Sequence, residues 1–141
     1  MRSCLVVDDS ATVRRTIAAA IRAARKGVQE VHEAEDPAAA LALFESQKPD
    51  VVFLDMMLAG DDPHAPDDQP ARGLGVLRSM LALRPDLPVV VVTGLANSQP
   101  DVVDAISLGA VAALRKPVKP EEVKYVLDAI EPDASRMDYF A

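Results

Sequence analysis

The chain has 141 residues, 50% of them hydrophobic, which is enough for one domain with a buried core. Its formal net charge is -7 and no Lys/Arg cluster falls on a candidate recognition helix, so the composition argues against nucleic-acid binding. No apolar run reaches membrane-spanning length, the N-terminus has no signal-peptide pattern, and the single cysteine, Cys4, rules out an internal disulfide. We therefore expect a cytoplasmic protein without a membrane segment.

Five short apolar runs alternate along the chain with five stretches of helical periodicity. The expected strands cover residues 4–7, 28–34, 51–55, 89–92 and 110–114. The expected helices cover residues 13–24, 37–47, 73–83, 100–108 and 120–130. This alternation implies right-handed crossovers and a parallel sheet that helices cover on both faces. The Val-rich strands fit the centre of the sheet, and the strand at 28–34, which charged residues interrupt, fits an edge.

Capping residues predict where several of these helices begin and end. Ser10 is placed to cap the first helix, Asp36 followed by Pro37 starts the second, and Gly27 and Gly109 are expected to close the first and fourth. Gly75 lies inside the third helix and should cost about 1 kcal/mol relative to alanine.

Two segments are expected to lie outside the regular elements. Residues 60–70 contain three prolines and four aspartates and should form a long solvated loop. The alternative is that this acidic loop borders the site described next and selects a partner. His64 in the loop and His32 on the polar edge strand are both expected to be merely solvated. Residues 132–141 should form a frayed tail, although Met137, Tyr139 and Phe140 could dock on this domain or on a partner.

Four of the five expected strands end on polar side chains that can do chemistry. These are Asp8 and Asp9, Asp55, Thr93 and Lys116. A carboxylate at the end of an apolar strand is disfavoured by desolvation unless it turns to water or is held in a site. Ligands of open parallel sheets bind beyond the carboxyl ends of the strands, which favours a site.

This set, together with Gly109-Ala110, Leu114 and Lys116-Pro117, resembles the receiver domain of two-component response regulators over residues 3–130. The resemblance implies an α/β fold, the flavodoxin-like doubly wound (βα)5 arrangement with strand order 2-1-3-4-5. Residues 1–131 would form this domain, with 60–70 as an insertion. In that order Asp8, Asp9 and Asp55 converge, and their mutual repulsion calls for a hard divalent cation, Mg²⁺ or Mn²⁺.

The resemblance also implies a role for each site residue. Asp55 would accept a phosphoryl group from a sensor histidine kinase or a phosphotransfer protein. Asp9, Asp55 and the backbone carbonyl of Met57 would bind the metal directly, and Asp8 through water. Lys116 would pair with Asp55, and its peptide bond to Pro117 would be cis. Thr93 would move toward the phosphoryl group, and the amide of Gly94 would contact it. The domain would not be an enzyme, except that it would promote its own phosphorylation and dephosphorylation.

This chain departs from the family pattern in ways that affect signalling. Ala113 stands where relatives carry an aromatic residue, so output would depend on backbone shifts after strands 4 and 5 or on Tyr125. Met57 and Leu95 are apolar where a polar side chain could orient an attacking water, which predicts slow loss of the phosphoryl group. The expected interaction face, for a downstream protein target or a transient homodimer, is formed by Val103, Ser107, Ala113 and Tyr125.

Two other functions are weighed against this one. The chain could be a receiver-like scaffold that binds partners without phosphorylation. It could also be a phosphatase or phosphotransferase with an Asp nucleophile, of the haloacid-dehalogenase-like type. Such enzymes carry a second Asp two residues after the nucleophile, where this chain has Met57, so the sequence disfavours that function.

Overall fold

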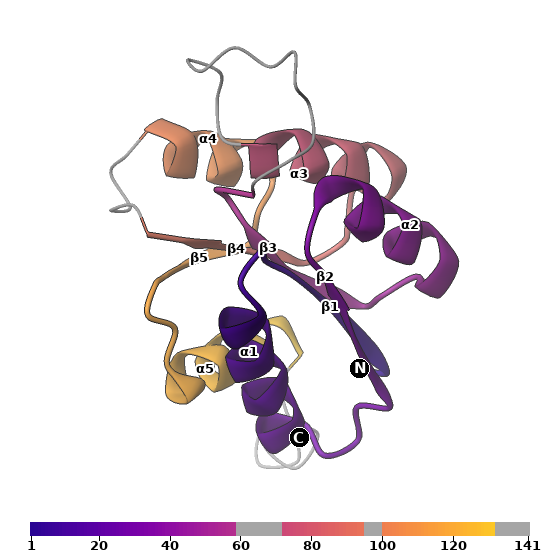
Figure 1. Ribbon diagram of the computed structural model, residues 1–141, viewed down its shortest axis with the longest axis vertical. Coiled ribbons are helices and arrows are strands. Elements are labelled where there is room, and N and C mark those ends of the chain that lie inside the picture. The colour runs from indigo at the N-terminus through magenta and orange to yellow at the C-terminus, as the bar shows by residue number, and fades with distance from the viewer. Residues whose placement is uncertain (59–71, 95–99, 132–141) are drawn as a thin grey trace, which may run out of the picture.

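The computed structural model describes residues 1–58, 72–94 and 100–131, with only the backbone of Arg72 (Figure 1). Its sheet is parallel, with the strand order β2-β1-β3-β4-β5. The strands are β1 Ser3–Val7, β2 Glu30–Ala34, β3 Val51–Asp55, β4 Val89–Thr93 and β5 Ala112–Arg115. The helices are α1 Ala11–Ala24, α2 Pro37–Gln47, α3 Arg72–Leu83, α4 Pro100–Leu108 and α5 Pro120–Ile130. The predicted fold class and strand order are both confirmed.

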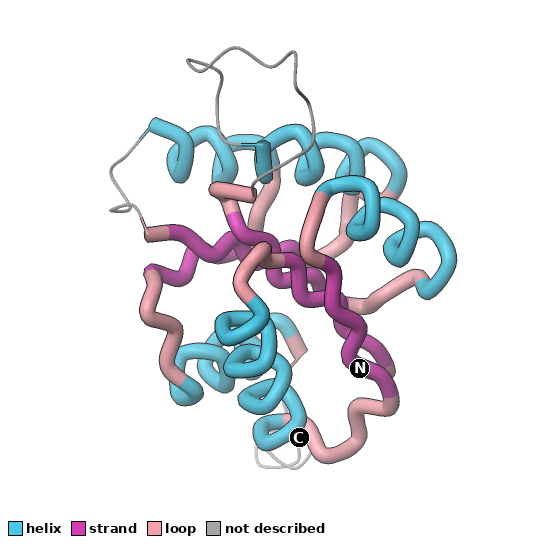
Figure 2. Tube along the Cα trace, in the orientation of Figure 1, coloured by secondary structure: helices cyan, strands magenta, loops and turns pink. Residues whose placement is uncertain are grey.

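Helices cover the two faces of the sheet, with α2, α3 and α4 on one face and α1 and α5 on the other (Figures 1 and 2). Side chains alternate along the central strands between two separate clusters of buried residues. Leu54 and Val91 belong to the cluster beneath α2 and α3, whereas Phe53 and Val90 belong to the cluster beneath α1 and α5. Every residue of β1, β3 and β4 is buried, which explains why these strands are continuous apolar runs.

Two of the predicted helix starts and one helix end take the expected geometry. The Val13 amide donates to Ser10 Oγ at 3.3 Å, and the Ala39 amide donates to Asp36 Oδ1 at 2.8 Å. Gly109 has φ = +124°, a backbone conformation that favours glycine, directly after α4.

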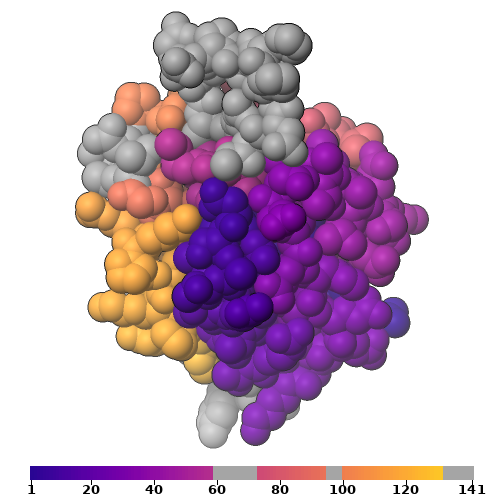
Figure 3. All heavy atoms as spheres, viewed as in Figure 1, coloured from indigo at the N-terminus to yellow at the C-terminus, as the bar shows by residue number. Residues whose placement is uncertain are grey.

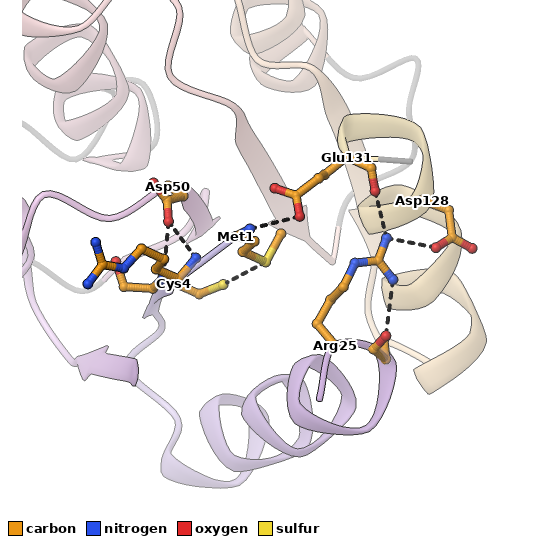
Figure 4. A network of polar contacts seen from close by, with 9 residues as sticks. Met1, Cys4, Arg25, Asp50, Asp128 and Glu131 are labelled. Atoms are coloured by element: carbon orange, nitrogen blue, oxygen red, sulfur yellow. Dashed lines mark hydrogen bonds and ion pairs between the residues drawn. The ribbon is translucent and has the colours of Figure 1, made fainter. Parts of the chain in front are cut away.

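The end of α1 differs from the prediction, because the helix stops at Ala24 and Gly27 does not close it. Arg25 is the C-cap, and its guanidinium donates to Asp128 Oδ1 and to the Glu131 carbonyl at the end of α5, both at 2.8 Å (Figure 4). These bonds fasten the base of α1 to α5, and the two helices lie side by side at the surface (Figure 3). The helix thus ends at Arg25, whereas Gly27 was expected to close it.

Two strands begin two residues later than predicted. β2 starts at Glu30, and β5 starts at Ala112. In the second case the Ala110 amide still donates to the Ala105 carbonyl of α4, so the chain joins the sheet only after that turn. Both strands lie at the edges of the sheet, as the polar residues of β2 predicted.

Several predicted features lie outside the described residues. They are the acidic loop 60–70 with His64, Leu95, and the tail 132–141 with Met137, Tyr139 and Phe140. Among the described helices, none combines the length and the apolar character needed to cross a bilayer.

Candidate functional site

Three carboxylates gather where β1 and β3 end. β1 and β3 are paired in parallel with Val7 opposite Leu54, so the residues that follow emerge side by side. One carboxylate oxygen from each of Asp8, Asp9 and Asp55 lies within 4.8 Å of the others. Asp8 and Asp55 are buried, whereas Asp9 is exposed. The convergence expected of these three residues is therefore present in the structure.

The backbone and side chain of Asp8 are held by neighbouring elements. Its amide donates to the Ala34 carbonyl at 3.0 Å, and its carbonyl accepts a 2.7 Å bond from the Arg14 guanidinium. Oδ1 accepts the Ser10 amide at 2.9 Å. The other oxygen, Oδ2, is buried, has no hydrogen bond of suitable geometry among the described residues, and is balanced by the charge of Lys116.

The carboxyl group of Asp55 is held at the end of β3 by the turn that follows. The Met57 amide donates to Asp55 Oδ1 at 3.0 Å, and the Met56 amide donates to the Val92 carbonyl of β4 at 2.9 Å. Burial raises the pKa of Asp55 and the charge of Asp8 adds to this, although the Met57 amide and Lys116 act in the opposite direction. The net shift is upward, as expected for a carboxylate that lacks sufficient positive charge nearby.

Lys116 supplies the positive charge from the end of β5. Its Nζ lies 3.0 Å from Asp8 Oδ2 and 3.4 Å from Asp55 Oδ2. Its amide donates to the Thr93 carbonyl at 2.7 Å, and its peptide bond to Pro117 is cis. Burial acts to lower the pKa of Lys116, but the two carboxylates outweigh it and hold the pKa above its ordinary value. Lys116 is therefore charged when it faces the acidic cluster.

The remaining predicted site residues lie at or just beyond the ends of β3 and β4. Thr93 is buried at the end of β4, the strand next to β3, and Gly94 follows it in an exposed position. The Met57 side chain, in contrast, is 54% exposed. The side chains that converge are thus those of Asp8, Asp55 and Lys116, with Asp9 at the rim.

The predicted interaction face is exposed for the most part. Val103 and Ser107 on α4 are exposed, Tyr125 on α5 is 77% exposed, and Ala113 in β5 is half-buried. The structure adds Ile106 and Val111, two exposed apolar residues that sequence reasoning did not single out. A hollow of about 380 Å³ lies beside Tyr125, and its lining consists of Pro88, Val111, Ala112, Tyr125, Val126, Ala129 and Ile130.

The chemistry of the acidic cluster fits a hard divalent cation. All three side chains offer oxygen, which Mg²⁺ and Mn²⁺ prefer, and a buried oxygen of Asp8 still lacks a well-aligned donor. Sequence reasoning missed Ser10 and Arg14, which bond to Asp8, and Gly73, whose amide donates to the Met56 carbonyl at 3.1 Å. Ser10 was expected only as a helix cap, and a single glycine in a helix gives no signal of what its backbone touches.

Comparison with known proteins decides the family. The family model described as "Response regulator receiver domain" matches residues 4–128. This chain belongs to that family. The resemblance drawn from the strand ends is thereby confirmed, and the function class follows: the chain is a receiver domain of two-component signalling.

Two solved structures show how similar the receiver is to known members of the family. The receiver domain of NtrX from Brucella abortus is 30% identical with a TM-score of 0.75, and the match covers 90% of this chain and 96% of that one. A response regulator protein from Burkholderia pseudomallei, solved with a phosphorylated aspartic acid, a calcium ion and citrate, is 27% identical with a TM-score of 0.71. That match covers 99% of this chain and 72% of the other.

Curated relatives include a protein-glutamate methylesterase/protein-glutamine glutaminase of Anaeromyxobacter dehalogenans, 38% identical over 114 residues. The match covers 80% of this chain but only 28% of that relative. The chain thus spans less than a third of the length of this relative, and the matched part is about as long as the receiver region. Receiver domains are regulatory, and the match to this relative covers too little of its length to indicate that the chain shares the relative's named activity.

Proposed function

We propose that this receiver is switched by phosphorylation of Asp55. The phosphoryl donor would be a phosphohistidine on a sensor histidine kinase or on a phosphotransfer protein. The observation that carries the proposal is the position of the Lys116 ammonium, which lies between two buried carboxylates, 3.0 Å from Asp8 and 3.4 Å from Asp55. A buried carboxylate can act as the nucleophile in phosphoryl transfer, and a charged lysine beside it can stabilise the transferred group.

In the proposed reaction an oxygen of Asp55 attacks the phosphorus of the phosphohistidine. The P–N bond breaks as the new P–O bond forms, and the imidazole leaves as a neutral ring because its other nitrogen carries the proton. Lys116 remains beside Asp55 and balances charge on the phosphoryl oxygens. The Thr93 hydroxyl and the Gly94 amide would donate hydrogen bonds to those oxygens once the group is in place.

The acidic cluster would hold one Mg²⁺, or Mn²⁺, during this reaction. Asp9, Asp55 and the Met57 carbonyl would be its direct ligands from the protein, and Asp8 would bind through water. When bound, the ion neutralises negative charge shared between the carboxylates and the incoming phosphoryl group. The Burkholderia pseudomallei regulator, which was solved with a phosphorylated aspartic acid and a calcium ion, supports the proposal that a protein of this fold can hold both a phosphoryl group and a divalent cation.

The proposed output is a change in partner binding on the face formed by Val103, Ser107, Ala113 and Tyr125. Ala113 is too small to act as a rotating aromatic, so the change would pass through the β4 and β5 loops or through Tyr125. The partner would be a downstream protein target, or transiently a second copy. Residues 1–131 would form the receiver domain, and a cytoplasmic location would fit a histidine kinase as the phosphoryl donor.

Mass spectrometry after incubation with acetyl phosphate tests the central step. With Mg²⁺ the wild type should gain one phosphoryl group, and the gain should disappear in Asp55→Asn and when the metal is chelated. Asp104→Asn, which removes an exposed carboxylate of α4, is the matched control and should be phosphorylated like the wild type. A wild type that stays unmodified would instead support the scaffold function, in which partners bind without phosphorylation.

The enzymatic alternative makes a different prediction. An Asp-nucleophile phosphatase needs a second acid near residue 57, and the side chain found there is an exposed methionine. We therefore propose that the receiver acts on no substrate other than its own phosphoryl group. Steady release of phosphate from an excess of a phosphate monoester would contradict this.

A further inference from the structure

The start of α3 packs against the backbone of the Asp55 turn. A Cβ atom on Gly73 would lie against the Asp55 carbonyl oxygen, 2.7 Å from Met56 Cα and 2.9 Å from the Met56 carbonyl oxygen. These are backbone atoms, so they cannot move aside as the end of a flexible side chain could. Only glycine fits at this position while the turn keeps its present path.

One peptide unit joins Gly73 to the carboxylate of Asp55. The carbonyl of Met56 accepts a 3.1 Å bond from the Gly73 amide. The amide on the other side of the same planar peptide, that of Met57, donates to Asp55 Oδ1 at 3.0 Å. Rotation of this peptide would therefore lengthen both hydrogen bonds and turn the Met57 backbone at the same time.

The other contacts of the turn fix it from the opposite side. The Met56 amide donates to the Val92 carbonyl of β4, and the Met56 side chain is fully buried. The turn is therefore held between β4 on one side and α3 on the other. The contact with α3 is possible only because residue 73 has no side chain.

We propose that Gly73 is a positioning residue for the proposed metal and phosphoryl site. It sets the orientation of the Met56–Met57 peptide, and through it the Asp55 carboxylate and the Met57 carbonyl. This proposal rests on the proposed function, because it concerns the residue that positions the groups of the same site. It also explains why the second residue of α3 is one of poor helix propensity.

The chain offers a matched control in the same helix. Gly75 lies two residues further on, and a Cβ built there meets nothing within 4 Å. Gly75→Ala therefore makes the same chemical change without touching the turn. It should leave Mg²⁺ affinity and phosphorylation at the wild-type level and should slightly stabilise the protein, because alanine favours the helix.

The experiment measures Mg²⁺ affinity by calorimetry and the rate of phosphorylation by acetyl phosphate. Gly73→Ala should bind Mg²⁺ about ten-fold more weakly, a loss typical of groups that orient metal ligands. Its phosphorylation should slow in parallel. Leu74→Ala serves as a second control, because it removes a buried core side chain next to Gly73 and lowers stability without entering the turn. Leu74→Ala should keep its Mg²⁺ affinity as long as it is folded.

A measurement on the wild type covers the case in which Gly73→Ala does not fold. Hydrogen exchange of the Gly73 amide should slow when Mg²⁺ is added, because the metal would hold the turn to which that amide donates. The proposal would be overturned if Gly73→Ala bound Mg²⁺ with the affinity of the wild type. It would also be overturned if the exchange rate of the Gly73 amide did not change when Mg²⁺ was added. If the wild type binds Mg²⁺ and is phosphorylated, the proposed function holds, and either of these outcomes would then count only against the role of Gly73.

Discussion

Oδ2 of Asp8 and Nζ of Lys116 lie 3.0 Å apart, in a cluster where a second carboxylate is 3.4 Å from the same ammonium. Lys116 therefore supplies the positive charge that a bound metal would also supply. Two cations that serve one cluster repel each other, so the lysine should favour phosphoryl transfer while weakening metal binding.

Replacing Lys116 with methionine should separate these two effects. The Lys116→Met variant should bind Mg²⁺ several-fold more tightly, because a nearby positive charge is gone. Its phosphorylation by acetyl phosphate should nevertheless be at least about ten-fold slower, because the charge beside the transferred group is lost. Calorimetry and single-turnover mass spectrometry measure the two quantities. Lys124→Met, which removes an exposed lysine of α5, should change neither, and equal or weaker Mg²⁺ binding by Lys116→Met would contradict the idea.

Met57 should control how long the phosphoryl group lasts. Its exposed side chain cannot orient a water by hydrogen bonding, so Met57→Asn should shorten the lifetime of phosphorylated Asp55 several-fold. The lifetime is measured by following loss of the added phosphoryl group by mass spectrometry after the donor is removed. Met57→Leu keeps the apolar character and is expected to behave like the wild type. An unchanged lifetime in Met57→Asn would show that the apolar side chain at position 57 is not the cause of slow phosphoryl loss.

Asp50 should make stability depend on pH. The amides of Arg2 and Ser3 donate to its Oδ2 at 2.7 Å and 3.1 Å, and although burial acts to raise its pKa, these bonds lower it overall. A lowered pKa stabilises the fold fully above the unfolded pKa of about 3.9, and this stabilisation is lost as the pH falls through the lower folded value.

Asp50→Asn should therefore lower the free energy of unfolding by about 1 kcal/mol at neutral pH. The difference from the wild type should shrink once the pH falls below about 4, because the Asp50 carboxyl of the unfolded chain then binds a proton more readily than that of the folded protein. Urea titrations at several pH values give the comparison, with Asp86→Asn as an exposed control on the chain before β4. A difference that stays constant from neutral to acidic pH would count against the charge of Asp50.

Cys4 should be unreactive in the folded protein. Burial, together with the charge of Asp50, raises the pKa of its thiol to about 12, so almost no thiolate is present near neutral pH. A disulfide reagent at pH 8 should label the native protein at least about a hundred-fold more slowly than the protein in concentrated urea. Rapid labelling of the native chain would show that β1 opens without global unfolding.

The sequence was sufficient for the architecture because buried strands carry an unmistakable pattern. Val51 to Leu54 form an apolar run that ends at the carboxylate of Asp55. In the structure Asp55 is buried at the end of β3. The order of the strands came from family resemblance, since alternating strands and helices fit more than one arrangement. Once the order is known, Asp8 and Asp55 must be neighbours.

What escaped prediction depends on contacts between distant segments. The end of α1 was assigned to Gly27, but the helix ends at Arg25, whose side chain bonds to Asp128 of α5 and to Glu131 just after it. The importance of Gly73 was missed for a related reason, because its missing side chain matters only through the backbone of residues 55 and 56. Local propensity cannot report a partner that is far away along the chain.

The first residue of the chain is part of the fold. The Met1 ammonium forms a 2.8 Å ion pair with Glu131 at the end of α5, and the Cys4 thiol donates to its sulfur at 3.4 Å (Figure 4). Any peptide fused ahead of Met1 would convert that ammonium into a neutral amide and remove the charge that pairs with Glu131. An affinity tag or reporter fused at Met1 should therefore weaken the contact between the start of the chain and the end of α5.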